Sequence, residues 1–206
     1  MGVAVQVLGV LLAASAWLTP MALLRRRRAG PVLAWAGQGA ALRAHWRPIA
    51  IVGLLATGGS TNHTLHLVAI ARAAGIIINW DDFDALSAIV PTLAKVYPNG
   101  SADVNQFHAA GGMGYLIGQL LHAGLLHEPV RTAFGTGLTR YTQRPMLADG
   151  LLTWQDTPAE SGNATILSTV EQPFAPDGGL RVLQGNLGRA VIKVSAVKPA
   201  NRVVQA

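Results

Sequence analysis

The residues best suited to hold an anion or a polyol form the run GGSTNH, residues 58–63. Glycines allow a backbone to approach a ligand closely, and the small polar residues here precede an amphipathic segment. If that segment is a helix, its first amides and its dipole would attract negative charge. An ordinary capped helix begins with the same pattern, so the run needs support from its neighbours.

Two side-chain groups could ligate a metal. His63 and His66 are three residues apart and would share a helix face, but no third ligand follows at a suitable spacing. We therefore favour a helix-surface or capping role for them. Asp81, Asp82 and Asp84 could bind a hard cation, yet they stand before another expected helix, which favours capping and dipole compensation.

A third group, in the run GLTRYTQRP, suits a phosphate ester. Arg140 and Arg144 offer guanidinium donors and Tyr141 offers a phenol hydroxyl. An ordinary surface loop is the alternative, and the residues alone do not decide between the two. The remaining histidines stand among apolar helix residues, which is typical of structural histidines: His108, His122 and His127.

The elements that must position these groups begin with a short apolar run. Residues 51–59 predict a strand that ends in a glycine turn, and residues 60–74 predict a helix capped by Ser60, Thr61 or Asn62 and closed at Gly75. The next helix is expected to start at Asp81 or Asp82, to bend or split at Pro91, and to end before Pro98.

Further along, a helix is expected from Asp103, interrupted at Gly111 and Gly112, and followed by another helix that Gly124 closes. From about residue 150 the hydrophobic period changes. Residues 164–199 alternate β-branched residues with the turn sequences PDGG and GNLG, which predicts the opening strands of a β domain. Helices followed by strands indicate an α/β chain with a helical layer packed on another layer.

Charge and cysteine content exclude several classes of function. The chain has 206 residues, 50% of them hydrophobic, and a net charge of +6. Six arginines before residue 51 account for that excess, since basic and acidic residues balance from residue 51 onward. A basic footprint confined to one end argues against nucleic-acid binding. Because there is no cysteine, the chain itself offers no disulfide, thiolate zinc site, cysteine nucleophile or cysteine-held iron–sulfur cluster.

Residues 1–50 differ in character from the rest. Residues 3–24 are apolar enough to suggest a membrane segment, and the arginine run 25–28 would then place the remainder in the cytoplasm. Polar residues and a proline interrupt that segment. We prefer to interpret residues 1–50 as a mistaken start or frame-shifted arm joined to the remainder.

Several stretches, in this order, resemble one enzyme family: GLLATGGSTNHTLHLVAIARAAGI, INWDDFDALS, YPNGSADVNQFHAAGGMGYLI, LLHAGLLHE, GLTRYT and EQPFAPDGGLRVLQGNLGRAVIKVSAVKP. Together they resemble the dihydroxy-acid and sugar-acid dehydratases. NHTLH and GLTRYT favour the phosphogluconate branch over the dihydroxy-acid branch. The resemblance extends from about Ile51 to the last residues, so residues 1–50 are expected to be unlike the family.

The resemblance implies a fold and an activity. The fold is α/β: helices and strands of an αβα N-terminal domain over residues 51–160, then the first strands of a C-terminal β-barrel domain over residues 161–206. The activity is that of a cytoplasmic, homodimeric hydro-lyase of the Entner–Doudoroff pathway, which dehydrates 6-phospho-D-gluconate to 2-dehydro-3-deoxy-6-phospho-D-gluconate. The family uses a 4Fe-4S cluster as Lewis acid and a divalent cation such as Mg²⁺.

This sequence departs from the family where the chemistry lies. The family's cluster cysteines and metal-site residues precede GGSTN, and its serine base follows beyond Ala206, so no catalytic residue and no metal ligand carries over. We expect an internal fragment, inactive alone, whose substrate-binding residues are Ser60, Thr61, Asn62, His63, Arg140 and Tyr141. The alternatives are a membrane-tethered sugar-acid-binding remnant, a dihydroxy-acid dehydratase, and a relic that does not fold stably.

Overall fold

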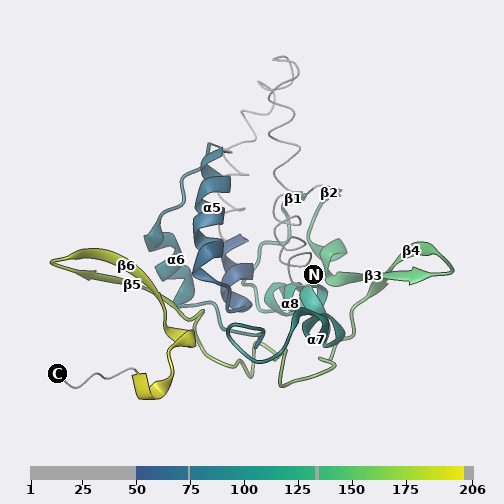
Figure 1. Ribbon diagram of the computed structural model, residues 1–206. Helices are drawn as coiled ribbons and strands as arrows, with labels where there is room; N and C mark the ends of the chain where they lie inside the picture. The colour runs from purple at the N-terminus through teal and green to yellow at the C-terminus, as the bar shows by residue number, and fades with distance from the viewer. Residues whose placement is uncertain (1–49, 74, 133–134, 202–206) are drawn as a thin grey trace, which may run out of the picture.

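The computed structural model describes residues 50–73, 75–132 and 135–201. Helices occupy its centre, and two hairpins extend from opposite sides of the molecule (Figure 1). The predictions made for residues 1–49, including the apolar segment 3–24, lie outside the described residues. Within the described ranges, no helix is both long and apolar enough to cross a membrane.

The first described element is helical, so the strand predicted for residues 51–59 was wrong. Residues 50–56 form a helix, and Ile51, Leu55 and Ala56 are completely buried. A short apolar run that is buried on every side carries no period that distinguishes a strand from a helix. The surrounding core decides the outcome.

Helix α5, Thr61–Ala73, confirms the helix predicted after GGSTN. It turns Thr64, Leu67 and Ala71 toward the core. Gly75 closes the helix as predicted: its amide donates to the Arg72 carbonyl (3.0 Å), and the Ile76 amide donates to the Ala71 carbonyl (2.8 Å).

Helix α6, Trp80–Ser87, differs from its prediction at both ends. Asn79, rather than Asp81 or Asp82, is the N-cap, and Asp82 completes a capping box by accepting from the Asn79 amide (2.9 Å). The helix stops before Pro91, which lacks an amide hydrogen and restricts the residue before it. Residues 92–96 are extended and bridge to residues 175, 167 and 102 instead of forming a second half-helix.

Helices α7, Val104–Ala109, and α8, Gly112–His122, confirm the predicted pair with its glycine interruption. Asp103 caps α7 in a capping box with Gln106, as the sequence indicated. Gly124 follows α8 and its amide donates to the Leu121 carbonyl (3.0 Å). The short 3-10 helix η1, Thr139–Thr142, packs against α8.

The strands form three separate two-stranded antiparallel sheets, and no closed barrel occurs among the described residues. The first sheet pairs β1 (Arg131–Thr132) with β2 (Gly135–Thr136). The hairpin of β3 (Gln143–Ala148) and β4 (Leu151–Asp156) was not predicted, although its Asp149–Gly150 turn is a typical hairpin signal.

The third sheet pairs β5 (Leu180–Gly185) with β6 (Gly188–Lys193), and the 3-10 helices η2 (Val194–Ala196) and η3 (Pro199–Asn201) follow. GNLG forms the turn of this hairpin, as predicted. The expected strands before it are wrong, because residues 164–179 contribute only isolated bridges to residues 92 and 94.

One hydrophobic core joins the parts of the chain. Phe83 from α6, Leu116 and Leu120 from α8, and Leu180 from β5 are all nearly or fully buried in it. Helix α6 packs on β5, α8 packs on η1 and β3, and α5 contacts β6. The start of α5 therefore lies beside the β5–β6 hairpin, although about 130 residues of chain separate them.

Candidate functional site

The two glycines of GGSTN have structural roles within the protein. Gly58 (φ +61°) ends helix 50–56 in a Schellman motif: its amide donates to the Leu55 carbonyl (2.9 Å), and the Gly59 amide donates to the Leu54 carbonyl (2.8 Å). A Cβ on Gly58 would lie 2.3 Å from the Asn99 side chain. The glycines are thus needed for a tight corner between two helices, whether or not a ligand binds there.

The polar residues of the run start helix α5. The Ser60 hydroxyl accepts a hydrogen bond from the Asn62 amide (3.2 Å), and the Ser60 carbonyl accepts one from the His63 amide (3.0 Å). Ser60, Thr61 and His63 are half-buried, whereas Asn62 is exposed. Their amides and side chains stand at the positive end of the helix dipole, where a phosphate or carboxylate is favoured.

Lys193, which the sequence reasoning missed, meets this corner from the end of β6. Its ammonium group donates to the Gly58 carbonyl oxygen. Burial lowers the pKa of Lys193. Burial also lowers the pKa of His63, and the positive charges of His66 and Lys193 lower it further. The start of α5 therefore has a positive environment that favours an anionic ligand. Nothing local in the sequence pairs residues so far apart.

Arg140 and Tyr141 lie elsewhere. They belong to η1, with Arg140 exposed and Tyr141 half-buried against the core. Glu128 holds this segment by accepting hydrogen bonds from the Leu138 amide (3.2 Å) and the Thr139 hydroxyl (3.0 Å). Because η1 packs on α8 while α5 contacts β6, the structure does not gather the six predicted substrate-binding residues at one place.

The acidic run before α6 serves local and tertiary structure. Asp82 is part of the capping box, and Asp81 pairs with Arg189 of β6. The carboxylate of Asp84 accepts a hydrogen bond from the Val182 amide of β5 (2.8 Å). These contacts agree with the capping interpretation and add a role in docking the β5–β6 hairpin.

The histidines predicted to be structural are exposed rather than enclosed: His108, His122 and His127. His108 and His122 lie on the solvent side of α7 and α8, and His127 lies in the segment after α8. Throughout the described ranges, no group of three or more His, Cys, Asp or Glu residues comes together to hold a metal ion.

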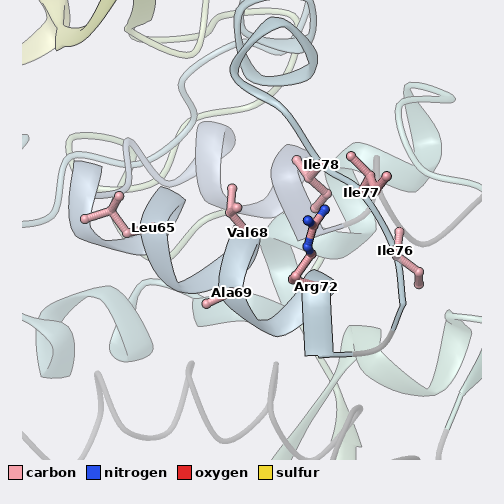
Figure 2. A pocket seen from close by; sticks show the side chains of 7 residues that line it. All are labelled: Leu65, Val68, Ala69, Arg72, Ile76, Ile77 and Ile78. Atoms are coloured by element: carbon pink, nitrogen blue, oxygen red, sulfur yellow. The ribbon is translucent and has the colours of Figure 1, made fainter.

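Two pockets flank α5. One, of about 330 Å³, lies between α5, α6 and the β5–β6 hairpin. Arg189, which forms an ion pair with Asp81, lines this pocket. Its lining residues are Thr61, Thr64, Leu65, Trp80, Val182, Arg189, Ala190 and Val191. The other, of about 260 Å³, lies between α5 and residues 76–78 (Figure 2). Arg72 is its only charged lining residue among aliphatic ones, so it suits a polyol phosphate poorly.

Comparison with known proteins agrees with these motifs. Residues 49–141 match the profile described as dihydroxy-acid/6-phosphogluconate dehydratase N-terminal, and residues 165–206 match the corresponding C-terminal profile. The chain belongs to the dihydroxy-acid/6-phosphogluconate dehydratase family. Helices α5 to α8 fall in the first matched stretch and the β5–β6 hairpin in the second, so the contact between Gly58 and Lys193 joins the two.

Individual members of this dehydratase family are similar over most of the chain. It is 60% identical to the phosphogluconate dehydratase of Pseudomonas aeruginosa and 58% identical to that of Escherichia coli K12, each over 76% of this chain and 26% of the relative. The Zymomonas mobilis phosphogluconate dehydratase is 47% identical over 98% of this chain and 35% of the relative. A dihydroxy-acid dehydratase of Sulfurisphaera tokodaii is 38% identical over 72% of this chain.

The chain thus spans about a quarter to a third of the length of the dehydratases it matches. That residues 1–50 are unlike the family stays a prediction.

The resemblance implies an iron–sulfur cluster, and the residues of this chain do not fit one. Cluster ligation needs thiolate donors, and the sequence contains no cysteine. The histidines that the structure describes are dispersed over α5, α7, α8 and the residues after α8, so among them there is no substitute set. No step through a cluster can be assigned to residues of this chain.

Proposed function

We propose that this chain forms part of the substrate-binding region of a phosphogluconate dehydratase, the hydro-lyase that converts 6-phospho-D-gluconate to 2-dehydro-3-deoxy-6-phospho-D-gluconate. The observation that carries the proposal is the 47–60% identity to enzymes of that name, against 38% to a dihydroxy-acid dehydratase. A dihydroxy-acid substrate is therefore less well supported.

The start of α5 supports an anionic, hydroxyl-rich ligand. The hydroxyls of Ser60 and Thr61, the amide of Asn62 and the imidazole of His63 offer donors and acceptors to a polyol. The helix dipole and the Lys193 charge favour the anionic groups of 6-phosphogluconate. In this proposal these residues bind and orient the substrate, and Arg140 with Tyr141 contacts a different part of it or of the enzyme.

Dehydration, as the resemblance implies it, needs a cluster held by thiolate ligands, and this chain has no cysteine to supply them. The resemblance implies that the cluster acts as a Lewis acid on the leaving hydroxyl, and that a divalent cation assists the dehydration. We propose that this chain alone does not turn over 6-phosphogluconate, and that a polypeptide with the thiolate ligands supplies that chemistry. The β5–β6 hairpin would be the start of the C-terminal barrel in a cytoplasmic, homodimeric enzyme.

Calorimetric titration of the purified chain tests the binding proposal. We expect saturable binding of 6-phosphogluconate, with D-gluconate and 2,3-dihydroxyisovalerate each at least about tenfold weaker because they lack the phosphate. Equal affinity for the dihydroxy acid would favour the other branch of the family. An assay for the 2-dehydro product after iron and sulfide treatment should give no turnover, and measurable turnover would overturn the proposed inactivity.

A further inference from the structure

The hydrogen bond from Lys193 to the Gly58 carbonyl joins the two family segments at the start of α5. It connects residues 135 positions apart, and both ends lie in stretches that match the family profiles. Gly58 lies in the turn between helix 50–56 and α5. The orientation of its carbonyl group therefore sets the direction of the chain through the next residues, Ser60–His63.

The corner is held from another side as well. The amides of Leu93 and Ala94 donate to the Ala56 carbonyl (2.8 and 3.2 Å), and Asn99 lies against Gly58. These contacts hold the end of helix 50–56, whereas the Lys193 contact lies at the glycine after it. Lys193 is thus placed to fix the final turn before α5.

Lys193 also differs from the other cations of its hairpin. Arg181 pairs with Asp177 (3.1 Å), and Arg189 pairs with Asp81. Among the described residues, Lys193 lies in no ion pair and donates to a neutral carbonyl, so its positive charge is not cancelled by a carboxylate. A half-buried charge next to a helix start is screened less than an exposed one.

We propose that Lys193 is a positioning residue for the start of α5: its ammonium group holds the Gly58 carbonyl and directs Ser60, Thr61 and His63 toward an anionic substrate. The substrate part rests on the proposed function, and the anchoring part does not. The lowered pKa of His63, partly caused by Lys193, agrees with a charge that reaches the first turn of α5.

Amide hydrogen exchange tests the anchor without any ligand. In Lys193→Met we expect the amides of Gly58–His63 to exchange at least about tenfold faster, while the α8 amides keep their rates. The matched control is Lys198→Met, the same substitution at an exposed lysine on the same segment, which should change neither. Equal acceleration at all amides would indicate general destabilisation and overturn the positioning role, as would unchanged rates at residues 58–63.

Binding tests the second part. Lys193→Met should bind 6-phosphogluconate at least about tenfold more weakly than the wild type, and Lys198→Met should bind as the wild type does. Unchanged affinity in Lys193→Met would contradict the role in substrate positioning. If the wild type binds no 6-phosphogluconate, the proposed function fails, while the exchange experiment still decides the anchor.

The absence of cysteine permits a chemical rescue. In Lys193→Cys the new thiol is the only one in the chain, and alkylation with 2-bromoethylamine restores an ammonium group at nearly the length of lysine. The alkylated protein should recover slow exchange at residues 58–63 and the wild-type affinity to within about threefold. If alkylation with a neutral ethyl group restores both equally, the charge has no part in the role.

Discussion

The side-chain hydroxyl of Ser87, the last residue of α6, accepts a hydrogen bond from the Leu180 amide at the start of β5 (3.1 Å). Ser87 is fully buried, and its carbonyl accepts a second bond from the Gly178 amide (2.9 Å). Together with the bond from the Val182 amide to Asp84, these contacts fasten the second family segment to the first. The position of Lys193 beside α5 depends on these contacts between α6 and the β5–β6 hairpin.

Ser87→Ala should therefore lower the free energy of unfolding by about 1–3 kcal/mol, because it leaves the buried Leu180 amide without an acceptor. Urea unfolding followed by circular dichroism measures the change. Ser101→Ala, at an exposed serine, should lie within about 0.5 kcal/mol of the wild type. A loss below about 0.5 kcal/mol in Ser87→Ala would show that the contacts between α6 and β5 contribute little to the free energy of unfolding.

Asn79→Ala should destabilise the protein by about 1 kcal/mol, since the Asn79 side chain accepts from the amides of Asp81 (2.9 Å) and Asp82 (3.1 Å). Asn79→Asp keeps an acceptor and should lose much less. Thermal unfolding compares the two with Asn105→Ala, where an exposed helix residue is replaced by a better helix former. If Asn79→Ala melts as the wild type does, the cap assignment is wrong.

Tyr115→Phe should leave stability unchanged or raise it by about 1 kcal/mol. The Tyr115 hydroxyl is buried and has no hydrogen-bond partner among the described residues, so removing it abolishes an uncompensated desolvation cost. Burial and the carboxylates of Glu171 and Glu160 raise the pKa of this phenol, which also disfavours its ionised form. Urea unfolding at neutral pH gives the answer, and a loss above about 1 kcal/mol would mean that the hydroxyl has a stabilising partner.

His63 should make stability depend on pH. Its pKa in the folded protein lies below the ordinary 6.5, so the unfolded chain binds more protons between the two values. Its contribution is complete above about pH 6.5 and is lost as the pH falls through the folded pKa.

The free energy of unfolding should fall less between about pH 7.5 and pH 5 in His63→Gln than in the wild type. His108→Gln, the same substitution at an exposed histidine of α7, serves as the matched control. A steeper fall in His63→Gln would reverse the assigned sign.

Local signals in the sequence predicted the parts of the fold that local chemistry determines. Gly75 and Gly124 close their helices, and Asp103 caps α7, because each works through hydrogen bonds within a few residues. Asn79 was missed in favour of Asp81 and Asp82, since all three residue types cap helices and only the backbone decides which one has extended geometry.

Parts that depend on distant chain segments were not predictable in the same way. The run from Ile51 to Ala56 is helical because the core surrounds it. Residues 92–96 are extended because distant residues, among them Ala56 and residues 166–175, supply hydrogen-bond partners for them. The candidate site likewise combines residues that local sequence identifies with residues that only the tertiary fold adds. Ser60–His63 could be named from GGSTN, whereas Lys193 is added by the tertiary fold, and Arg140 and Tyr141 lie on a different element from α5.

Calorimetric titration of 6-phosphogluconate into the wild-type chain and into Lys193→Met tests the binding role of α5 and Lys193 most directly. We expect saturable binding to the wild type and affinity at least about tenfold lower in Lys193→Met. Absence of binding to the wild type, or equal affinity in both proteins, would contradict this role.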